Sequence, residues 1–390
     1  METSYPRLKS ILYPIAVATC GILPVFLTGA LGLQIRDDLG FDQMALGIVT
    51  SAFFTAQALV STPIGRLVAR VNPRRAMQVA ALGSGGTLAC VALFTNSWLL
   101  LLLCLILGGI ANAVSQLASS LFLTREISFQ RQGLAFGLKE ASKPAATLLC
   151  GIAVPLFGAT FGWQWAFAAF ALVAFAIGGT VPKISRARPM TESEVHGRTV
   201  HPAPLVLLAA GAGLGSAATA ALGVFVVESG VTSGLSLSVA GATLATGSVV
   251  GIGVRIVFGW VADQRPMDHM RIVAGMLIVG AVGFLLLAVG VSLCFIAGTL
   301  LAFGAGWGWL GLFNFAIVSR HPEAPTRALG IALTGAAAGS AAGPLLFSAI
   351  LSSSSFGTAW LCAGVGTLLA AAFMLAGRWM AVRYSTSPLS

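Results

Sequence analysis

The chain has 390 residues, of which 57% are hydrophobic and only 9% are charged, and its net charge is +10. A soluble domain carries roughly 25% charged residues, so this composition excludes an ordinary water-soluble protein and indicates one whose surface faces lipid. The basic residues lie between apolar runs along the whole chain, a pattern typical of membrane topology, and we expect no nucleic-acid partner.

Twelve apolar runs are long enough to cross a bilayer, which takes about 20 residues. In the first half of the chain they cover residues 11–35, 44–64, 76–95, 98–123, 134–158 and 163–182. In the second half they cover residues 203–227, 239–262, 272–290, 292–318, 328–351 and 357–377. We therefore predict an all-α polytopic membrane protein with two six-helix bundles, residues 1–182 and 203–390, joined by a hydrophilic cytoplasmic linker at 183–202.

The basic residues also predict the orientation of the chain. If the connecting segments alternate between inside and outside from an internal N-terminus, 18 of the 22 Lys and Arg residues fall inside. Arg36 is the one outside, set among Asp37, Asp38 and Asp42, and the other three lie within spans. The positive-inside rule then places both termini in the cytoplasm, and we expect a multi-pass protein of a bacterial cytoplasmic membrane.

The sequence has no motif that indicates metal binding, disulfide bonds, nucleotide binding or catalysis. The six cysteines fall inside apolar runs without the spacing of a metal site or a disulfide framework. The chain has no Walker motif, and its spans have no paired acids or histidine clusters that would indicate catalysis. We expect no metal, no cofactor and no enzymatic activity, and a protein that acts as a monomer in the lipid bilayer.

A short motif follows the second span and returns in part after the eighth. Its residues are Gly65, Arg66, Arg70 and Arg74 in the first copy, and Gly259, Asp263 and Arg265 in the second. The pattern resembles the signature of the major facilitator superfamily, and the resemblance extends over the whole chain. It implies two six-helix bundles, alternating access around a site between them, and a contact between the motif's acid and a neighbouring helix that locks the outward-facing state.

The chain departs from that family pattern at several positions. Ala69 stands where the first motif copy usually has an acid, which puts the locking contact in doubt on the N-terminal side. Cys104 replaces an arginine expected in span four, and the antiporter signature of span five survives only as Gly151, Pro155 and Gly158. These departures argue against a proton-driven multidrug exporter.

Ionisable residues within spans are the strongest candidates for a site, because each is costly to insert into a bilayer. Lys139 and Lys143 lie one turn apart in span five with Glu140 beside them, and Arg255 lies well inside span eight. In a structural interpretation the lysines reach toward the interface, Glu140 pairs with Lys143, and Arg255 pairs with Asp263 or a carbonyl. In a functional interpretation the three cations form a positive cavity that binds an anion. Glu140 is then the candidate for proton coupling, with a static ion pair as the alternative.

Polar and aromatic residues in spans one, four, seven and ten are further candidates to line such a cavity. They are Tyr13, Thr28, Asn112, Gln116, Ser216, Thr219, Trp307 and Asn314. Each could instead make a hydrogen bond between helices. Glu228, at the outer end of span seven, is an outer-gate acid or a solvated residue. The glycine-rich run 304–309 permits span ten to bend.

Two segments suggest the substrate class by resemblance. The stretch from Arg255 to Asp263 resembles span eight of facilitators that carry monocarboxylates and oxalate, which implies that Arg255 contacts a carboxylate. Residues 137–144 resemble permeases of the cyanate-permease type. We predict secondary transport of a small organic anion, such as a monocarboxylate, by proton symport, with anion exchange as the second mechanism. The alternatives are efflux of drug-like compounds by proton antiport, a non-transporting sensor on the same fold, and an intramembrane enzyme.

Overall fold

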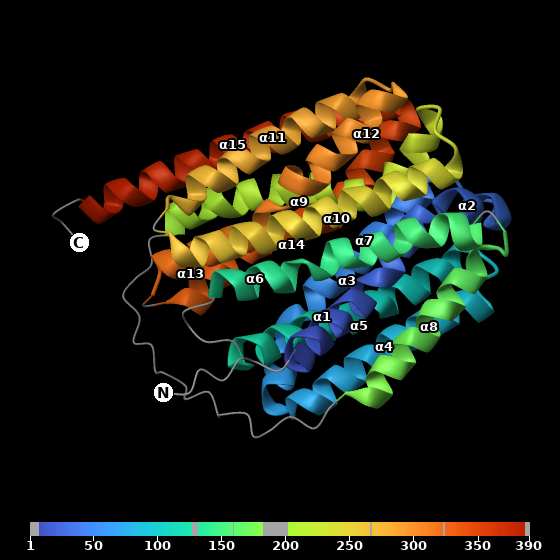
Figure 1. The fold of residues 1–390 in the computed structure, drawn as a ribbon, viewed down its shortest axis with the longest axis horizontal. Coiled ribbons are helices and arrows are strands. Elements are labelled where there is room, and N and C mark those ends of the chain that lie inside the picture. The colour runs from blue at the N-terminus through green and yellow to red at the C-terminus, as the bar shows by residue number, and fades with distance from the viewer. Residues whose placement is uncertain are drawn as a thin grey trace.

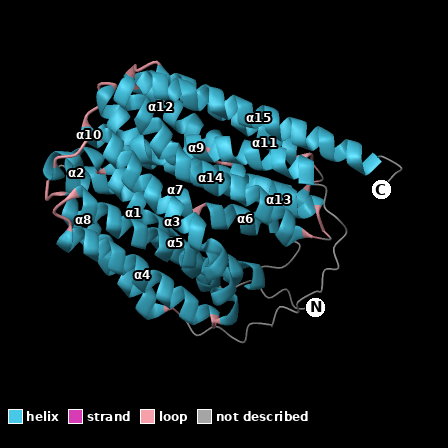
Figure 2. Cartoon of the chain, turned by 180° about the vertical axis from the view of Figure 1, so that it is seen from behind, coloured by secondary structure: helices cyan, strands magenta, loops and turns pink. Residues whose placement is uncertain are grey.

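The structure is a computed structural model that describes residues 8–126, 132–158, 160–181, 202–265, 267–322 and 324–386. In these ranges the chain forms helices and short connections, without strands (Figure 2). The helices of the first half are α1 (Leu8–Ala30), α2 (Gly32–Leu39), α3 (Gln43–Arg70), α4 (Pro73–Phe94), α5 (Trp98–Glu126), α6 (Gln132–Glu140), α7 (Ser142–Ala153) and α8 (Trp163–Thr180). Those of the second half are α9 (Pro202–Thr232), α10 (Leu237–Gln264), α11 (His269–Ala288), α12 (Ser292–Leu301), α13 (Trp309–Arg320), α14 (Pro325–Ser353) and α15 (Phe356–Thr386).

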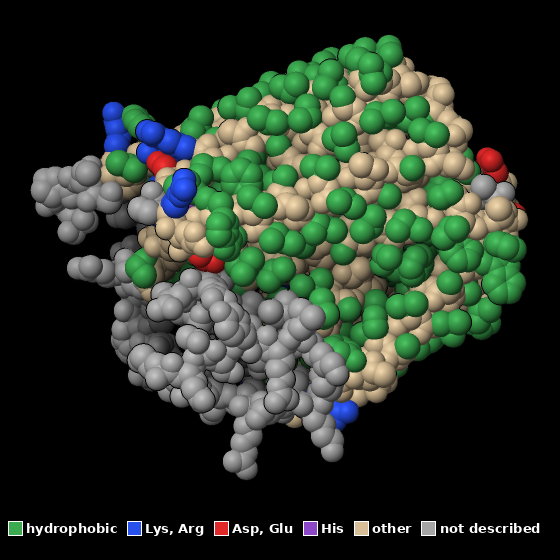
Figure 3. Space-filling view, in the orientation of Figure 1, with side chains coloured by type: hydrophobic (Ala, Val, Ile, Leu, Met, Phe, Trp, Pro, Cys, Tyr) green, Lys and Arg blue, Asp and Glu red, His purple; other side chains and the backbone are tan. Residues whose placement is uncertain are grey.

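Twelve helical stretches among the described residues are long and apolar enough to cross a membrane, which confirms the twelve predicted spans and the all-α fold. Their outer surface is apolar, with leucines such as Leu59, Leu107 and Leu293 at 75%, 60% and 76% exposure. Figure 3 shows hydrophobic side chains spread over the wide face and Lys and Arg gathered mainly at one end. Such a surface fits a lipid solvent. The linker predicted at 183–202 lies outside the described residues except for Pro202.

The two ends of the bundle carry different charged residues, and we call them the basic end and the Glu228 end. At the basic end α3 and α10 finish and α4 and α11 begin, with Arg70, Arg74 and Arg271 nearby. At the Glu228 end lie Glu228, near the end of α9, and the short helix α2. Figure 1 shows the helices of the first half on one side and α9 to α15 on the other, with α6 and α7 beside α10 at their junction.

Three of the predicted spans are interrupted. The first run, 11–35, divides at Leu31 into α1 and the polar α2, which carries Arg36 and Asp37. Span five breaks at Ala141, where Pro144 has no N–H to donate to the carbonyl of Glu140. Span ten passes through a π-helical turn at Ala302–Gly306 and resumes as α13, in the glycine-rich region expected to bend.

Small residues bring α14 and α9 into close contact. Gly335, Gly339 and Gly343, spaced four apart on α14, lie against the carbonyls of Ala209, Gly213 and Ala217 on α9. A Cβ atom at any of the three glycines would overlap the facing backbone. In lipid, where no hydrophobic effect drives helices together, such close approach stabilises packing.

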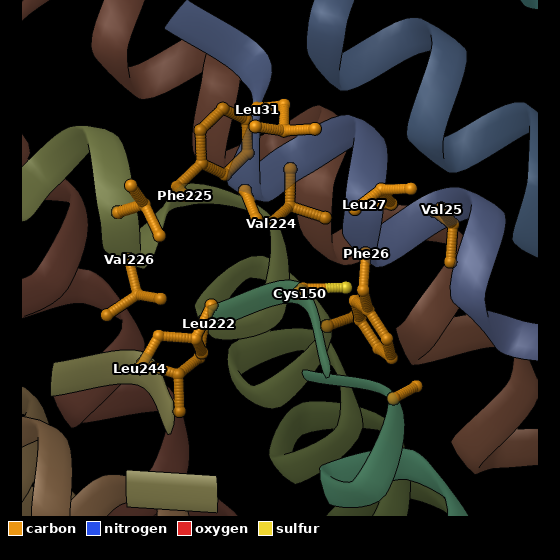
Figure 4. Close-up of a cluster of buried hydrophobic side chains, with 14 of the residues drawn as sticks. Val25, Phe26, Leu27, Leu31, Cys150, Leu222, Val224, Phe225, Val226 and Leu244 are labelled. Atoms are coloured by element: carbon orange, nitrogen blue, oxygen red, sulfur yellow. The ribbon is translucent and has the colours of Figure 1, made fainter. Parts of the chain in front are cut away.

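The buried apolar side chains form three clusters, and their distribution separates the two ends of the bundle. The largest cluster lies toward the Glu228 end and includes residues of both halves, such as Phe26 and Leu27 from α1 and Leu222 and Phe225 from α9 (Figure 4). Toward the basic end each half has its own cluster, one around Met77 and one around Phe313. The halves therefore share a core at the Glu228 end and have separate cores at the basic end.

Candidate functional site

The break in span five carries an ionic cluster. The Glu140 carboxylate is 2% exposed and accepts one hydrogen bond at each oxygen, from Lys139 Nζ at 2.8 Å and from Lys143 Nζ at 2.7 Å. The two lysine side chains keep 20% and 22% exposure. The pair of Glu140 with Lys143 is the one that the structural interpretation of the sequence named. One acid thus neutralises only one of two ammonium groups.

Arg255 adds a third cation close to this cluster, and its guanidinium is bound to backbone. The side chain is 2% exposed. Its Nη1 donates to the carbonyl of Gly251 at 2.9 Å, and its Nη2 donates to the carbonyl of Trp307, directly after the π-helical turn of span ten. A carbonyl freed by a broken helix within a membrane must find a donor in the protein. Arg255 therefore supports the bend in span ten. The structural interpretation of the sequence gave it either Asp263 or a carbonyl as partner, and the structure shows carbonyls.

A small cavity of about 30 Å³ lies between the two halves. A cavity needs roughly 10–15 Å³ to hold one water molecule, so this space holds only a few atoms. Its lining comes from both halves: Ile22, Phe26, Phe54, Lys143, Ser216, Thr219, Ala220, Trp307, Trp309, Leu310 and Ser340. Lys143 is the one charged side chain among them, so the cavity is an aromatic chamber with an ammonium group in its wall.

The Trp307 side chain connects this chamber to Arg255. Its ring packs edge-on against Phe26 of the other half, with centroids 5.4 Å apart, and the Arg255 guanidinium carbon lies 5.8 Å from its centroid. Of the polar candidates predicted from the sequence, Lys143, Ser216, Thr219 and Trp307 line the cavity. The Trp309 indole nitrogen also lacks a hydrogen-bond partner although it is buried.

The amide candidates of span four belong instead to a network inside the first half. Asn112 is fully buried and donates to Gln57 Oε1 at 2.8 Å. Gln116 donates to Asn112 Oδ1 and to the carbonyl of Ala18, both at 3.3 Å. These contacts join α5 to α3 and α1, so the structure places both amides between helices rather than in the cavity wall.

Three further candidates also lie away from the cavity. Tyr13 packs half-buried against the apolar cluster of the first half at the basic end. Thr28 is fully buried and donates to the carbonyl of Pro24 at 2.8 Å. Asn314 on α13 is 2% exposed, and its Oδ1 has no hydrogen-bond partner.

The second copy of the repeated motif makes a contact between the two halves. The carboxylate of Asp263 accepts from the backbone N–H of Gly133 at 2.7 Å and of Leu134 at 2.9 Å, at the N-terminus of α6. Gly259 lies one turn earlier, and a Cβ there would come within 2.7 Å of the Gly133 carbonyl oxygen. An anion at a helix N-terminus satisfies free N–H groups and the helix dipole. Asp263 thus caps a helix of the opposite half.

The first copy of the motif makes no equivalent cap among the described residues. Arg66 and Arg70 are exposed, and Gly65 lies near Leu117. Arg74 donates from Nε to the carbonyl of Val181 at 3.0 Å, a contact within the first half. On the opposite half, α14 begins at Pro325, and its N-cap residue Ala324 makes no side-chain cap. Ala69, at the position that Asp263 has in the second copy, has no carboxylate with which to cap a helix.

A second contact between the halves lies at the Glu228 end. Glu228 Oε1 accepts from Arg36 Nη1 and from Gln43 Nε2, both at 2.8 Å. The side chains of Arg36 and Glu228 are 15% and 5% exposed. The sequence left the role of Glu228 open and did not identify its partners. The isolation of Arg36 as the one basic residue predicted on that side was the signal that could have found the pair.

Sequence reasoning also missed the aromatic part of the cavity wall. Phe26, Phe54 and Trp309 are ordinary apolar residues in a hydropathy profile, and nothing local marks them as lining a cavity. Gln57, the partner of Asn112, could have been found as a polar amide within span two. Which helix face meets the cavity depends on packing between spans that lie far apart in the chain.

An all-helical bundle of two halves around a central cavity is the architecture of a membrane transporter. The family model of the Major Facilitator Superfamily matches residues 15–344, and the chain belongs to this superfamily. Among solved structures it is similar to a bacterial homolog of the human lysosomal transporter Spinster, in an inward-facing and unoccupied conformation. The TM-score is 0.69, with 14% identity over 98% of each chain, and this likeness supports the fold. No curated protein matches the chain.

Proposed function

We propose that this facilitator transports a small monovalent anion, such as a monocarboxylate, through the chamber that contains Lys143. The observation that carries the proposal is the charge at its centre. Lys139, Lys143 and Arg255 are three cations, and Glu140 is the one acid that pairs with any of them in the described structure. Unpaired positive charge in a low-dielectric interior is costly unless an anion joins it, so the cluster favours an anionic substrate.

The roles of the three cations differ. Lys143 lines the cavity and is the group we assign to direct contact with the anion. Lys139 holds the other oxygen of Glu140 and leaves Lys143 less than fully neutralised. Arg255 acts through Trp307, because its Nη1 and Nη2 are bound to the carbonyls of Gly251 and Trp307, while its buried Nε has no hydrogen-bond partner.

The volume of the chamber argues against the efflux alternative. Pockets for drug-sized ligands have volumes of about 300–1,000 Å³ and are lined mainly by apolar groups. A cavity of about 30 Å³ with a lysine in its wall favours a solute of a few heavy atoms with a negative charge. A cationic drug would be repelled by Lys143 and Arg255.

We further propose that the basic end faces the cytoplasm and that transport is coupled to protons. The orientation is supported by the Lys and Arg residues at that end, as the positive-inside rule requires. Uptake of an anion together with a proton moves no net charge, so a membrane potential that is negative inside does not oppose it.

The test is uptake into proteoliposomes of a panel that includes formate, acetate, oxalate, nitrate and a neutral amide, with and without a pH gradient. We compare Lys143→Gln with Lys139→Gln. Both variants remove one cation and one hydrogen bond to Glu140, but only Lys143 lines the cavity. Lys143→Gln should raise the KM for the anion at least tenfold, and Lys139→Gln should raise it less. Equal effects of the two variants, or uptake of the amide in preference to every anion, would contradict the proposal.

A further inference from the structure

Arginines of three helices converge on one carboxylate at the basic end of the second half. Asp268, at the start of α11, pairs with Arg271 of the same helix, whose Nε lies 3.6 Å from Oδ2. Arg320, at the end of α13, lies with its Nη2 3.4 Å from Oδ1, and Arg378 of α15 pairs with Oδ2. We call these four residues the Asp268 cluster. One carboxylate neutralises one guanidinium, and arginine stays charged in proteins, so the cluster keeps an excess of two positive charges.

No other acid compensates for this excess in the described part of the second half. The remaining acids there are Glu228, which lies at the opposite end of the bundle, and Asp263, which caps α6. Further arginines lie at the same end as the cluster: Arg265 and Arg327 are exposed, and so is Arg383 on the last turns of α15. Figure 3 shows this concentration of Lys and Arg at one end of the molecule. The surface around the cluster therefore attracts anions.

The guanidinium groups of the Asp268 cluster have donors for a further anion. Arg320 and Arg378 each donate one hydrogen bond to Asp268, and the 3.6 Å pair of Arg271 is longer than a hydrogen bond. A guanidinium has five N–H donors, in a fork that matches the oxygens of a phosphate or a carboxylate. The side chains of Arg271 and Arg320 keep 68% and 33% exposure. Both can therefore bind an anion that approaches from outside the bundle.

An exposed apolar stripe on α15 lies directly beside this charge. α15 has 31 residues and is about 46 Å long, whereas the hydrocarbon of a bilayer is about 30 Å thick. Its last turns extend past the start of α11 at the basic end (Figure 1). Leu375, Trp379 and Val382 lie three or four residues apart, so they share one face, and they are 42%, 51% and 43% exposed. The Arg383 guanidinium carbon lies 3.6 Å from the centroid of the Trp379 ring. An exposed tryptophan beside arginines is typical of the membrane–water interface.

The cluster and the stripe together match an anionic phospholipid. An inorganic anion would neutralise the excess charge of the cluster but would make no use of the apolar stripe. A zwitterionic lipid would cover the stripe but would bring no net negative charge. Basic residues next to a membrane span attract anionic headgroups, and apolar side chains at the same level contact acyl chains. An anionic lipid is therefore the partner whose chemistry fits both features.

We propose that the Asp268 cluster binds the phosphate of an anionic phospholipid whose acyl chains lie along the exposed stripe of α15. Asp268 already joins α11, α13 and α15, so the phosphate adds a second anion at the junction of the same three helices. The arginines keep their charge at every physiological pH, so binding responds to ionic strength rather than to pH. Binding of this lipid is independent of the solute that the protein transports.

The experiment counts lipids bound to the full chain in detergent by native mass spectrometry. Phosphatidylglycerol and phosphatidylcholine with the same acyl chains are titrated separately, so that the lipids differ only in the headgroup. The unchanged protein should bind the first phosphatidylglycerol about tenfold more tightly than the first phosphatidylcholine. The double variant Arg271→Gln/Arg320→Gln should lose this preference. The matched control Arg75→Gln/Arg327→Gln removes two exposed arginines of the same end that lie outside the cluster, and it should keep the preference.

Two single variants keep the test decisive. Arg271→Gln leaves the pairs of Arg320 and Arg378 with Asp268 in place, so it serves if the double variant does not fold, and it should reduce the preference. Trp379→Ala should weaken the binding of both lipids by a similar factor and keep the preference between them. Equal binding of the two lipids to the unchanged protein, or a loss of preference in the control as large as in the cluster variant, would overturn the proposal. Displacement of bound phosphatidylglycerol by millimolar inorganic phosphate would also overturn it, because the site would then be one for free anions.

Discussion

Replacement of Asp263 by alanine should open the basic end of the protein. The change removes two hydrogen bonds, of 2.7 and 2.9 Å, from the backbone N–H groups of Gly133 and Leu134. Loss of an N-cap side chain costs about 0.5–2 kcal/mol, and a hydrogen bond to a charged group contributes about 1.5–3 kcal/mol. Because Asp263 is half-buried and water replaces part of the lost interaction, we expect about 2 kcal/mol in total.

This free energy acts on the equilibrium between the halves, because Asp263 and α6 belong to different halves. At about 1.4 kcal/mol per factor of ten, it enlarges the population that is open at the basic end about 30-fold. The assay uses spin labels at Arg75 and Arg327, which are exposed on opposite halves at that end. The long-distance population in nanodiscs should increase in Asp263→Ala.

Asp268 provides the matched control for this experiment. Asp268 also lies at the basic end, and it makes ion pairs with Arg271, Arg320 and Arg378, all within the second half. Asp268→Ala should therefore lower the stability of that half without changing the distance distribution. The reasoning is refuted if Asp268→Ala opens the basic end as far as Asp263→Ala does, or if Asp263→Ala leaves it closed.

Two other predictions concern stability, measured by thermal unfolding of the purified protein in detergent. Partial burial alone would raise the pKa of Asp268, but the hydrogen bond and charge of Arg378 outweigh it and hold this pKa below its usual range. The ionised Asp268 therefore stabilises the fold at pH values above its unfolded-state pKa, and this stabilisation is lost as the pH falls through its folded-state pKa. Asp268→Asn should be destabilising at pH 7 and nearly neutral in acid. Gly339→Ala should cost about 1–3 kcal/mol, because its Cβ overlaps the carbonyl of Gly213, whereas Gly330→Ala on the same helix meets open space and should gain about 0.5–1 kcal/mol. A Gly330→Ala variant as unstable as Gly339→Ala would contradict the packing argument.

The sequence predicted the fold because bilayer thickness imposes a length on each span and lipid imposes its apolarity. Both constraints act locally, so twelve spans are readable without any knowledge of how they pack. The break at Ala141 follows from Pro144, which is also a local cause. The pair of Glu140 with Lys143 was predictable because residues three apart share a helix face.

The site was less predictable because it depends on contacts between distant spans. Whether Arg255 faces a substrate or a carbonyl depends on the bend in span ten, 52 residues away, and hydropathy carries no information about that geometry. The same holds for Asn112, which was a candidate for the cavity until its partner Gln57, 55 residues earlier, fixed its direction. Arg36 and Glu228 lie 192 residues apart, and their pairing follows from the arrangement of the two halves.

The two ends of the protein are held together by different forces. At the Glu228 end the halves share one apolar core, and an ion pair from α2 to α9 lies over it. At the basic end each half has its own core, and the contact across the halves runs through α6, capped by Asp263. Separation at the Glu228 end must therefore part a shared apolar core and an ion pair, whereas separation at the basic end parts the Asp263 cap and the close packing of α6 against α10 and α13 without disruption of a common core.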